Sequence, residues 1–405
     1  MRGTLRIALT VAALAAAIII GIACVGKQLR TGSDFPIYYS AARTLLSGGS
    51  PYDVSSGLHG YVYLPFFALL LAPLAALPLP AAAAVWYGAN VTFAAASIRA
   101  ALRLAGEGMP GGMATWALVA ALAPLLGLFH DNLVLGQANL FLLSLVIGGV
   151  SGLLGSRDRV WPGLLLGIAA ALKMNAALLI VPVLIRGRLR PVAGFAVGLA
   201  AALLLPMLVL GPARGVELMG QWRAKVVTPA AEGTLQGSKI WDQSPAAGLR
   251  RLLVDAPAYD ETRVNVVSLT QARFTMLSRA AGAAILVALI WVWIAGKGKE
   301  RHDALLLDMC IACCGMLLVL GFNLKAQFVL LLLPAMAAAS RAVSIPALGG
   351  RGVRAALLAA GGLLVLSNPG LAGRAVSNFA LAYSSLALAT LLLAGVLARM
   401  RLRSV

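Results

Sequence analysis

Long apolar segments, separated by short stretches that carry Lys and Arg, constrain this chain more than any other feature of its sequence. Many of them, such as residues 191–210, approach the roughly 20 residues that an α-helix needs to cross a bilayer. Hydrophobic residues make up 60% of the chain and charged residues only 12%, whereas a soluble domain carries about 25% charged residues. The apolar runs are continuous, which disfavours a β-barrel. The sequence predicts an all-α polytopic membrane protein with a single integral membrane domain, 1–405.

The net charge of +19 comes from basic residues scattered at the ends of these apolar segments. Such a distribution is typical of topology determinants and of contacts with lipid headgroups. We therefore expect membrane lipids as partners and no nucleic acid. The oligomeric state is left open.

The path of the chain through the membrane depends on residues 61–79, which are apolar but are interrupted by Pro65, Pro73 and Pro78. If this stretch lies in the membrane interface, more than half of the Lys and Arg residues fall in short loops and tails on one side. The positive-inside tendency makes that side cytoplasmic. This interpretation predicts an inner (plasma) membrane protein with both termini cytoplasmic. Its first outer, periplasmic loop is 27–80, with interfacial helices, and a long outer loop is 211–273.

About twelve transmembrane segments follow from this topology. They are 5–26, 81–103, 114–130, 136–155, 160–173, 176–186, 191–210, 274–296, 303–322, 325–340, 353–367 and 379–398. The fifth and sixth are too short for a full crossing at 1.5 Å per residue. We expect these two to form a hairpin whose tip is 173–175.

Asp34 is the only acidic residue among the first 52. It lies in residues 31–53, a polar stretch rich in aromatic and small residues, on the predicted outer side. One hypothesis makes Asp34 the catalytic base of a membrane enzyme. The alternative is an Asp that caps a helix, a common signal at helix N-termini, and the residue pattern alone favours this alternative.

Polar residues at membrane depth are costly and therefore candidates for function. Lys173 could snorkel to the headgroups or act as the counter-ion of a lipid phosphate. Gln137 and Asn139 follow His130 at a predicted outer helix end, where they could bind a sugar hydroxyl or cap a helix. Asp308 is expected to form an interhelical hydrogen bond.

Two further groups lie on the predicted outer side. Arg250 and Arg251 follow Gln243 in the long loop, and such a set suits a phosphate or polar headgroup, although a solvated surface is the alternative. Lys325 and Gln327 begin the tenth segment, where they could face a cavity that the other polar residues of the outer side also face.

The sequence lacks a Walker loop, an HExxH motif, a nucleophile elbow, a DxD motif and an EF-hand. We expect no metal site and no cofactor. A base, a Lys and amides on the outer face fit group transfer from a lipid-phosphate donor, which needs a carboxylate for the acceptor proton and cations for the departing phosphate.

Several stretches in order resemble glycosyltransferase family 87 (the DUF2029 domain) of the GT-C class, which includes polyprenol-phosphate-mannose-dependent α-1,2-mannosyltransferases. They are DFPIYYSAARTLLSGGSPYD, YVYLPF, GQANLFLLSL, GLLLGIAAALKMN, WDQSPAAGLRRL and LKAQFVLLLLP, and they span about residues 5–340. Their order and spacing carry the resemblance.

The resemblance implies a GT-C fold and a membrane glycosyltransferase that moves a hexose or pentose, by default mannose. It implies transfer from a polyprenyl-phosphate sugar to a lipid or glycan acceptor by an inverting single displacement at the periplasmic face, with Asp34 as catalytic base. The candidates for donor or acceptor binding are then Tyr38, Tyr52, His130, Gln137, Asn139, Lys173, Asn175, Gln243, Arg250, Arg251, Lys325 and Gln327.

The chain departs from the family pattern at two places. The family commonly has Asn where this chain has Asp242, and many members have a His before the tenth helix, where this chain has Asn323, Lys325 and Gln327. Two other functions remain: a transporter or flippase of a lipid-linked substrate, and an inactive family member that assists assembly. A transporter favours internal repeats, and the sequence shows none.

Overall fold

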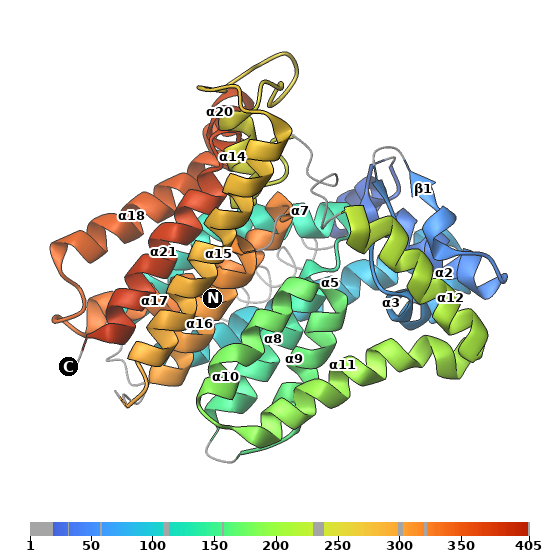
Figure 1. Ribbon diagram of the computed structural model, residues 1–405, viewed down its shortest axis with the longest axis horizontal. Coiled ribbons are helices and arrows are strands. Elements are labelled where there is room, and N and C mark those ends of the chain that lie inside the picture. The colour runs from blue at the N-terminus through green and yellow to red at the C-terminus, as the bar shows by residue number, and fades with distance from the viewer. Residues whose placement is uncertain are drawn as a thin grey trace, which may run out of the picture.

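A computed structural model describes residues 19–30, 32–56, 59–107, 113–155, 158–229, 239–298, 303–319 and 322–403 of the chain. Its α-helices are α2 (Asp34–Leu46), α3 (Pro65–Leu70), α4 (Ala72–Ala75), α5 (Leu79–Gly106), α6 (Met113–Leu122), α7 (Leu126–Leu135), α8 (Asn139–Leu154), α9 (Trp161–Leu172), α10 (Val181–Ile185), α11 (Leu189–Leu210), α12 (Pro212–Trp222), α14 (Pro245–Leu253), α15 (Gln271–Ala295), α16 (Ala304–Leu318), α17 (Leu332–Ser344), α18 (Arg351–Leu366), α19 (Pro369–Ala372), α20 (Arg374–Ala382) and α21 (Ser385–Leu402) (Figure 1).

Shorter elements connect these helices. The 3₁₀ segments are η1 (Pro51–Asp53), η2 (Ala123–Leu125), η3 (Met174–Ile180) and η5 (Lys325–Leu331), and η4 (Arg223–Val227) is a π-helical turn. The named strands in the described residues, β1 (Ser55–Ser56) and β2 (His59–Gly60), form one antiparallel hairpin. The all-α prediction is thus confirmed apart from this small hairpin.

Six helical stretches in the described residues are long and apolar enough to cross a membrane. They are Leu79–Gly106, Thr115–Leu135, Leu189–Leu210, Gln271–Ala295, Lys325–Ser344 and Ser385–Leu402. Five shorter apolar helices accompany them: Ile19–Gln28, Asn139–Leu154, Trp161–Leu172, Met174–Ile185 and Ala304–Leu318. In the described residues, fewer helices are therefore long enough to cross a membrane than the twelve transmembrane segments predicted. Most of the predicted first segment, residues 5–18, lies outside the described residues.

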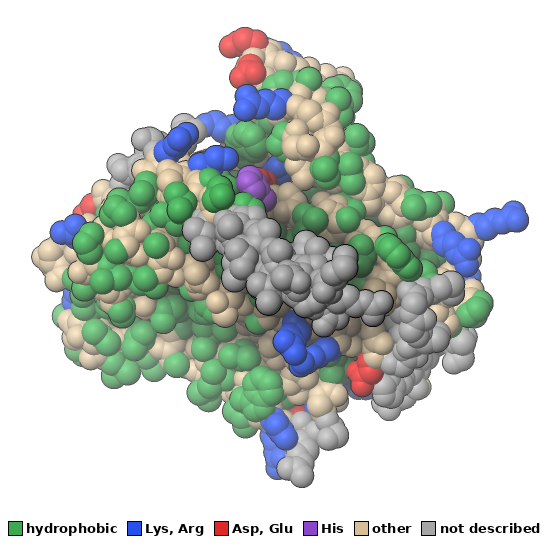
Figure 2. All heavy atoms as spheres, turned by 180° about the vertical axis from the view of Figure 1, so that it is seen from behind, with side chains coloured by type: hydrophobic (Ala, Val, Ile, Leu, Met, Phe, Trp, Pro, Cys, Tyr) green, Lys and Arg blue, Asp and Glu red, His purple; other side chains and the backbone are tan. Residues whose placement is uncertain are grey.

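Large apolar side chains cover much of the outer surface. Leu208 on α11 is 81% exposed and Met276 on α15 is 72% exposed. Both side chains belong to strongly apolar helices, whose residues would be expected in the core of a soluble protein. Figure 2 shows hydrophobic side chains spread over one face of the molecule, with Lys and Arg side chains in small separate groups. Exposed apolar area of this extent is unfavourable in water but matches a bilayer. The protein is membrane-embedded.

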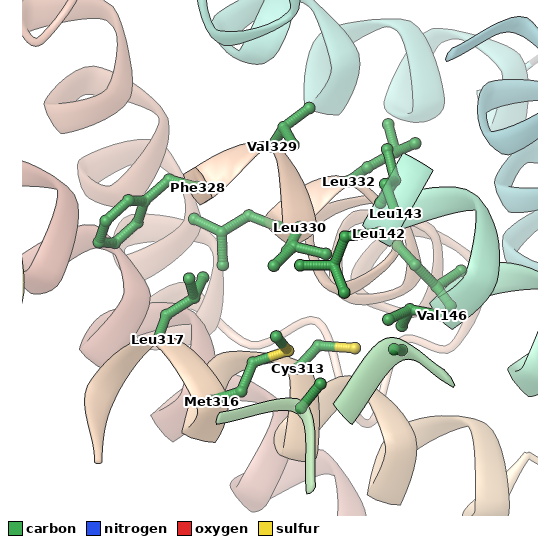
Figure 3. Close-up of a cluster of buried hydrophobic side chains, with 14 of the residues drawn as sticks. Leu142, Leu143, Val146, Cys313, Met316, Leu317, Phe328, Val329, Leu330 and Leu332 are labelled. Carbon is green, nitrogen blue, oxygen red and sulfur yellow. The ribbon is translucent and has the colours of Figure 1, made fainter. Parts of the chain in front are cut away.

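The central core is built around η5 and α17, whose continuous helical stretch is almost wholly buried. Leucines of α8 and sulfur-containing side chains of α16 pack against it, as the cluster around Leu142, Cys313 and Phe328 shows (Figure 3). All four cysteines are free and buried. This core holds together the segments that carry Lys173, Lys325 and Gln327.

The predicted hairpin of the fifth and sixth segments is present. α9 ends at Leu172, Lys173 is extended, η3 packs back against α9, and α10 continues from η3. At the base of the hairpin Arg188 donates to the carbonyl oxygen of Leu153 at 2.6 Å and lies 3.4 Å from the Asp158 carboxylate. Lys173 therefore lies at the tip.

Helix α9 crosses α11 with almost no space between the two backbones. A Cβ atom on Gly163 or Gly167 of α9 would lie within 2.2 Å of a backbone carbonyl oxygen of α11. In the same way, a Cβ atom on Gly194 or Gly198 of α11 would lie within 2.3 Å of the carbonyl oxygen of Val160 or Leu164, at the start of α9. Two reciprocal GxxxG pairs thus form a membrane-type helix contact. The contact anchors the first arm of the hairpin.

The first outer loop forms a layer of short elements, α2 through α4. The six residues of α3 and the four of α4 are each too few to cross a bilayer, and the interfacial location of residues 61–79 stays a prediction. Helix α12 of the long loop docks on this layer, where Arg214 donates to the carbonyl oxygens of Gly48 and Gly49 at 2.9 Å. The two predicted outer loops are therefore neighbours (Figure 1).

Three predicted helix boundaries are wrong. The segment 114–130 is a helix that continues to Leu135 through the 3₁₀ turn η2, which begins beside Pro124. The segment 379–398 is two helices, because the left-handed Ser384 (φ 56°) separates α20 from α21. The helix predicted over 303–322 ends at Leu318. Tertiary contacts described below fix the Ser384 break.

Basic helix ends meet at the end of the molecule opposite the Lys173 tip. Arg341 donates to the carbonyl oxygen of Ala105 at 2.8 Å and pairs with Asp303 at 3.1 Å. The C-terminus of α5, with Arg103 in its last turn, therefore lies at the same end of the molecule as the N-terminus of α16. The basic C-terminal ends of α5 and α17 therefore lie close together, while the side of the membrane that they face stays a prediction.

The predicted interhelical hydrogen bond of Asp308 is confirmed and has two partners. Arg186 donates to Oδ2 at 2.6 and 3.0 Å, and Arg401 donates to Oδ1 at 2.8 Å. Asp308 and Arg401 are each 2% exposed. The carboxylate ties α16 to the end of α10 and to α21.

Replacement of Asp308 by Ala should destabilise the fold strongly. Removal of the carboxylate takes from two basic side chains the acid that they share, and the loss of one partner of a buried ion pair costs about 3–5 kcal/mol. We expect a marked loss of thermal stability of the purified protein in detergent. Asp158→Ala is the matched control, because its carboxylate is 38% exposed and pairs with Arg188 at 3.4 Å. Equal melting temperatures for the two variants would contradict the prediction.

Candidate functional site

Asp34 is the first residue of α2, immediately after the N-cap residue Ser33. The residue is half-buried, and its carboxylate forms a hydrogen bond with the side chain of Gln137. Burial raises the pKa of the Asp34 carboxyl to about 6, whereas this hydrogen bond and the positive charge of Lys173 lower it. Ser33, rather than Asp34, occupies the capping position, so the capping alternative does not describe Asp34. Its carboxylate instead faces side chains from α7–α8 and from the hairpin tip.

The turn that brings Gln137 to Asp34 depends on Gly136. Gly136 ends α7 in the left-handed conformation (φ 65°), and a Cβ atom there would lie 2.7 Å from the Cβ of Phe35. The carbonyl oxygen of Gly136 accepts a hydrogen bond from the Trp86 indole at 2.8 Å. Only glycine combines this backbone conformation with so close an approach. The turn therefore fixes Gln137 against the start of α2.

A short relay of amides continues from Gln137. The Asn139 amide donates to Oε1 of Gln137, which leaves the Gln137 amide nitrogen as the donor to Asp34. Asn139 is fully buried, and its Oδ1 has no hydrogen-bond partner among the described residues. The predicted pair Gln137 and Asn139 thus lies at the Asp34 carboxylate, where it orients the acid.

Lys173 approaches the same carboxylate from the hairpin tip. Its Nζ donates to Oε1 of Gln327 at 2.8 Å, and its charge acts on Asp34. Gln327 is 1% exposed, and its Nε2 has no acceptor among the described residues. Two residues earlier, Lys325 pairs with Asp131 at 2.9 Å. The structure therefore brings together Asp34, Gln137, Asn139, Lys173 and Gln327.

Two tyrosine hydroxyl groups also lie close enough to Asp34 to feel its charge. Tyr38, one turn further along α2, shares a hydrogen bond of 3.1 Å with the hydroxyl of Tyr63. Burial is the main reason that the pKa of Tyr63 is raised, and the charge of Asp34 adds to it. Tyr52 donates to the carbonyl oxygen of Tyr63 at 2.9 Å. Tyr38 is next to the acid, whereas Tyr52 supports the aromatic cluster.

A second polar network begins at Asn175, beyond the hairpin tip. The Asn175 amide donates to Oδ1 of Asn323 at 3.0 Å, and the backbone N–H of Asn323 donates to Oδ1 of Asp242 at 3.1 Å. Asp242 and Asn323, which are far apart in the sequence, are thus in direct contact. Oδ2 of Asp242 has no partner among the described residues.

Two of the predicted binding residues have architectural contacts. Gln243 donates to the carbonyl oxygens of Ile240 and Leu381 at 2.7 Å. Arg251 is fully buried and donates to the carbonyl oxygen of Ala382 at 2.9 Å, as well as to the hydroxyl of Ser384. These bonds hold the break between α20 and α21. They favour a structural role for both residues over contact with a headgroup.

Two further candidates lie away from the Asp34 carboxylate. Arg250 donates to Gln271 at 2.9 Å and lies over the ring of Phe274. The His130 side chain is 59% exposed, and its Nδ1 is 3.9 Å from Asp131. Both stay candidates for an acceptor headgroup.

The sequence interpretation overlooked Tyr63 and the pairing of Asp131 with Lys325. Opposite charges at two predicted outer helix ends were a usable signal for the pair. Tyr63 had no signal beyond its aromatic context. Among the described residues, no group of three His, Cys, Asp or Glu side chains could hold a metal ion.

Comparison with known proteins gives one match. The model of glycosyltransferase family 87 matches residues 61–321. No curated protein and no solved structure matches the chain. The matched residues include Gln137, Asn139 and Lys173 but not Asp34, Lys325 or Gln327.

Proposed function

The chain belongs to glycosyltransferase family 87, and from this premise we propose that it transfers a sugar from a polyprenyl-phosphate donor to a lipid or glycan acceptor, with Asp34 as general base. Family and fold together make it a membrane glycosyltransferase, which displaces the transporter alternative. The observation that carries the proposal is the Asp34 carboxylate, raised in pKa to about 6 and placed beside Gln137 and Lys173. A base with a pKa near the working pH is well suited to proton transfer.

The proposed reaction is a single displacement. The acceptor hydroxyl oxygen attacks the anomeric carbon of the sugar, and its proton passes to the Asp34 carboxylate. The bond between the anomeric carbon and the phosphate oxygen breaks, and the prenyl phosphate departs with the electron pair. Attack opposite the leaving group inverts the anomeric centre.

Lys173 is the proposed contact for the donor phosphate. Its ammonium group lies at the hairpin tip, half-buried, and forms one hydrogen bond to Gln327 at 2.8 Å. An ammonium group has three N–H donors, so it can bind Gln327 and a phosphate oxygen together. A fixed positive charge stabilises the charge that develops on the leaving phosphate.

The amides and phenols are proposed to orient the sugar and the acid. Gln137 and Asn139 hold the Asp34 carboxylate toward the reacting centre, and Tyr38 is placed for a sugar hydroxyl. We further propose a GT-C fold and an active site that faces the periplasm of an inner-membrane protein with cytoplasmic termini. Mannose is the default sugar.

A direct assay tests the proposal. Purified protein is incubated with a radiolabelled polyprenyl-phosphate mannose and with a membrane extract of acceptors, and the label is followed into lipid and glycan fractions. Label that enters a product supports the proposal. A comparison of envelope glycans and glycolipids from a deletion strain then identifies the missing sugar. An intact envelope and no label transfer with mannose, other hexoses or pentoses would refute it.

The pH dependence of transfer should follow the ionisation of Asp34. Only the ionised carboxylate accepts a proton, so kcat/KM should rise with pH to a plateau with an apparent pKa of about 6. One pH unit below that value the rate should be about tenfold lower than the plateau. Measurement of kcat/KM between pH 4.5 and 8.5 checks this. A rate that is constant across that range would contradict the assignment.

A further inference from the structure

A partly enclosed cavity of about 270 Å³ lies at the base of the hairpin, at the other end from Lys173. Its walls come from α10 and the turn after it, from the C-terminal ends of α15 and α21, and from the start of α16. The lining residues are Pro182, Ile185, Arg186, Arg188, Trp293, Gly296, Lys297, Gly298, Leu305, Asp308 and Arg401. The proposed transferase chemistry uses none of them.

The charge of this cavity is unbalanced. Four basic side chains line it, those of Arg186, Arg188, Lys297 and Arg401, against the single carboxylate of Asp308. Asp308 accepts hydrogen bonds from both Arg186 and Arg401. Even with Asp158 counted against Arg188, the described residues leave a positive excess. A set of basic side chains around one cavity attracts an anion.

A buried donor points to the same conclusion. Trp293 lines the cavity and is 2% exposed, and its indole N–H has no hydrogen-bond acceptor among the described residues. A buried N–H without an acceptor is costly, and buried Trp donors usually find a partner. An anion bound in the cavity would supply acceptor oxygens in a space that Trp293 and the basic side chains line together.

We propose that this cavity binds a phosphate group, carried by an anionic lipid headgroup or free in solution. Phosphate offers several acceptor oxygens, which suit the planar donor fork of arginine and the point charge of lysine. Basic pockets between membrane helices are known sites for lipid headgroups. Lys297 is exposed at the edge of the cavity, where it can meet the phosphate first.

Binding measurements on the full-length protein test the proposal without any transferase assay. Protein in mixed micelles with equal parts of phosphatidylglycerol and phosphatidylcholine is analysed by native mass spectrometry. In parallel, binding of radiolabelled inorganic phosphate is measured by equilibrium dialysis against chloride of equal ionic strength. Preferential retention of phosphatidylglycerol alone identifies a headgroup site. Saturable binding of inorganic phosphate identifies a site for the free anion.

Two variants connect the binding to this cavity. Lys297→Gln removes an exposed charge, and Trp293→Phe removes the indole N–H and keeps an aromatic ring. Each should weaken the observed binding about tenfold, the effect of one charge-assisted or buried hydrogen bond. Arg354→Gln is the matched control, an exposed basic residue of α18 outside the cavity, and should bind as the wild type does.

The proposal has clear contrary outcomes. Absence of both preferential lipid retention and phosphate binding in the wild type overturns it. Unchanged binding by the Lys297→Gln protein, whose substitution lies on the surface, overturns it even if Trp293→Phe fails to fold. An equal loss in the Arg354→Gln control would show a general charge effect and would overturn it as well.

Discussion

Asp34→Asn should abolish sugar transfer and leave a folded, membrane-inserted protein. The amide keeps the shape of the carboxylate but cannot accept the acceptor proton, and loss of a general base typically lowers the rate by about 10²–10⁴-fold. The pKa of Asp34 is raised from 3.8 to about 6 in the folded protein, so the folded state favours the protonated carboxyl group. The stability that this group contributes is therefore lost as the pH rises through 6. The neutral Asn should therefore melt at the same or a higher temperature at pH 7.

The combination of lost activity with retained stability separates catalysis from structure. Asp53→Asn is the matched control, because Asp53 lies in the same outer loop and is exposed, with Lys225 at 2.8 Å. It should transfer sugar at the wild-type rate. Wild-type activity in the Asp34→Asn protein would remove Asp34 from the mechanism, and a fall in its melting temperature would favour a structural role.

Lys173→Met should weaken the use of the donor and change the pH profile. Loss of a hydrogen bond between an ammonium group and phosphate corresponds to about 1.5–3 kcal/mol, or a fall of about 10–100-fold in kcat/KM for the donor. The positive charge of Lys173 also lowers the pKa of Asp34. Its removal should therefore shift the rising limb of the pH profile above pH 6. Kinetics with varied donor and varied pH measure both effects.

Lys225→Met is the control for this variant. Lys225 is another Lys on the outer loops, paired with Asp53 and 49% exposed, so its removal should alter neither the donor kinetics nor the pH profile. A Lys173→Met protein with weaker donor use but an unshifted pH profile would contradict the placement of Lys173 beside Asp34. An unchanged kcat/KM for the donor would contradict its contact with phosphate.

Membrane character and the identity of the main polar residues could be read from the sequence because both have strong local signals. A charged side chain in an apolar segment is costly, so Lys173 and Asp308 were recognisable without a structure. The hairpin followed from the length of its two arms. Asp34 was visible as an isolated acid, but its local pattern suggested a cap, because the carboxylate's partners lie more than 100 residues away.

Other features depend on contacts that no local pattern encodes. Arg250 and Arg251 are adjacent and look alike in sequence, yet Arg251 is sealed beneath the α20–α21 break while Arg250 lies over Phe274. The break itself at Ser384 is held by hydrogen bonds from Gln243 and Arg251. Helix propensity within residues 379–398 gives no sign of it, which is why that segment was predicted as one helix.

The class of the protein follows from the sequence alone, because apolar length and charge placement decide whether a helix is surrounded by water or by a bilayer. The same sequence also marked Asp34, the amides of Gln137 and Asn139, and Lys173 as separate candidates. Only the packing of distant segments shows which of these side chains lie together. Burial of Asp34 against Gln137, and the return of the hairpin that carries Lys173 to the same point, arise from packing between distant segments, and that packing sets both the pKa and the partners of the acid.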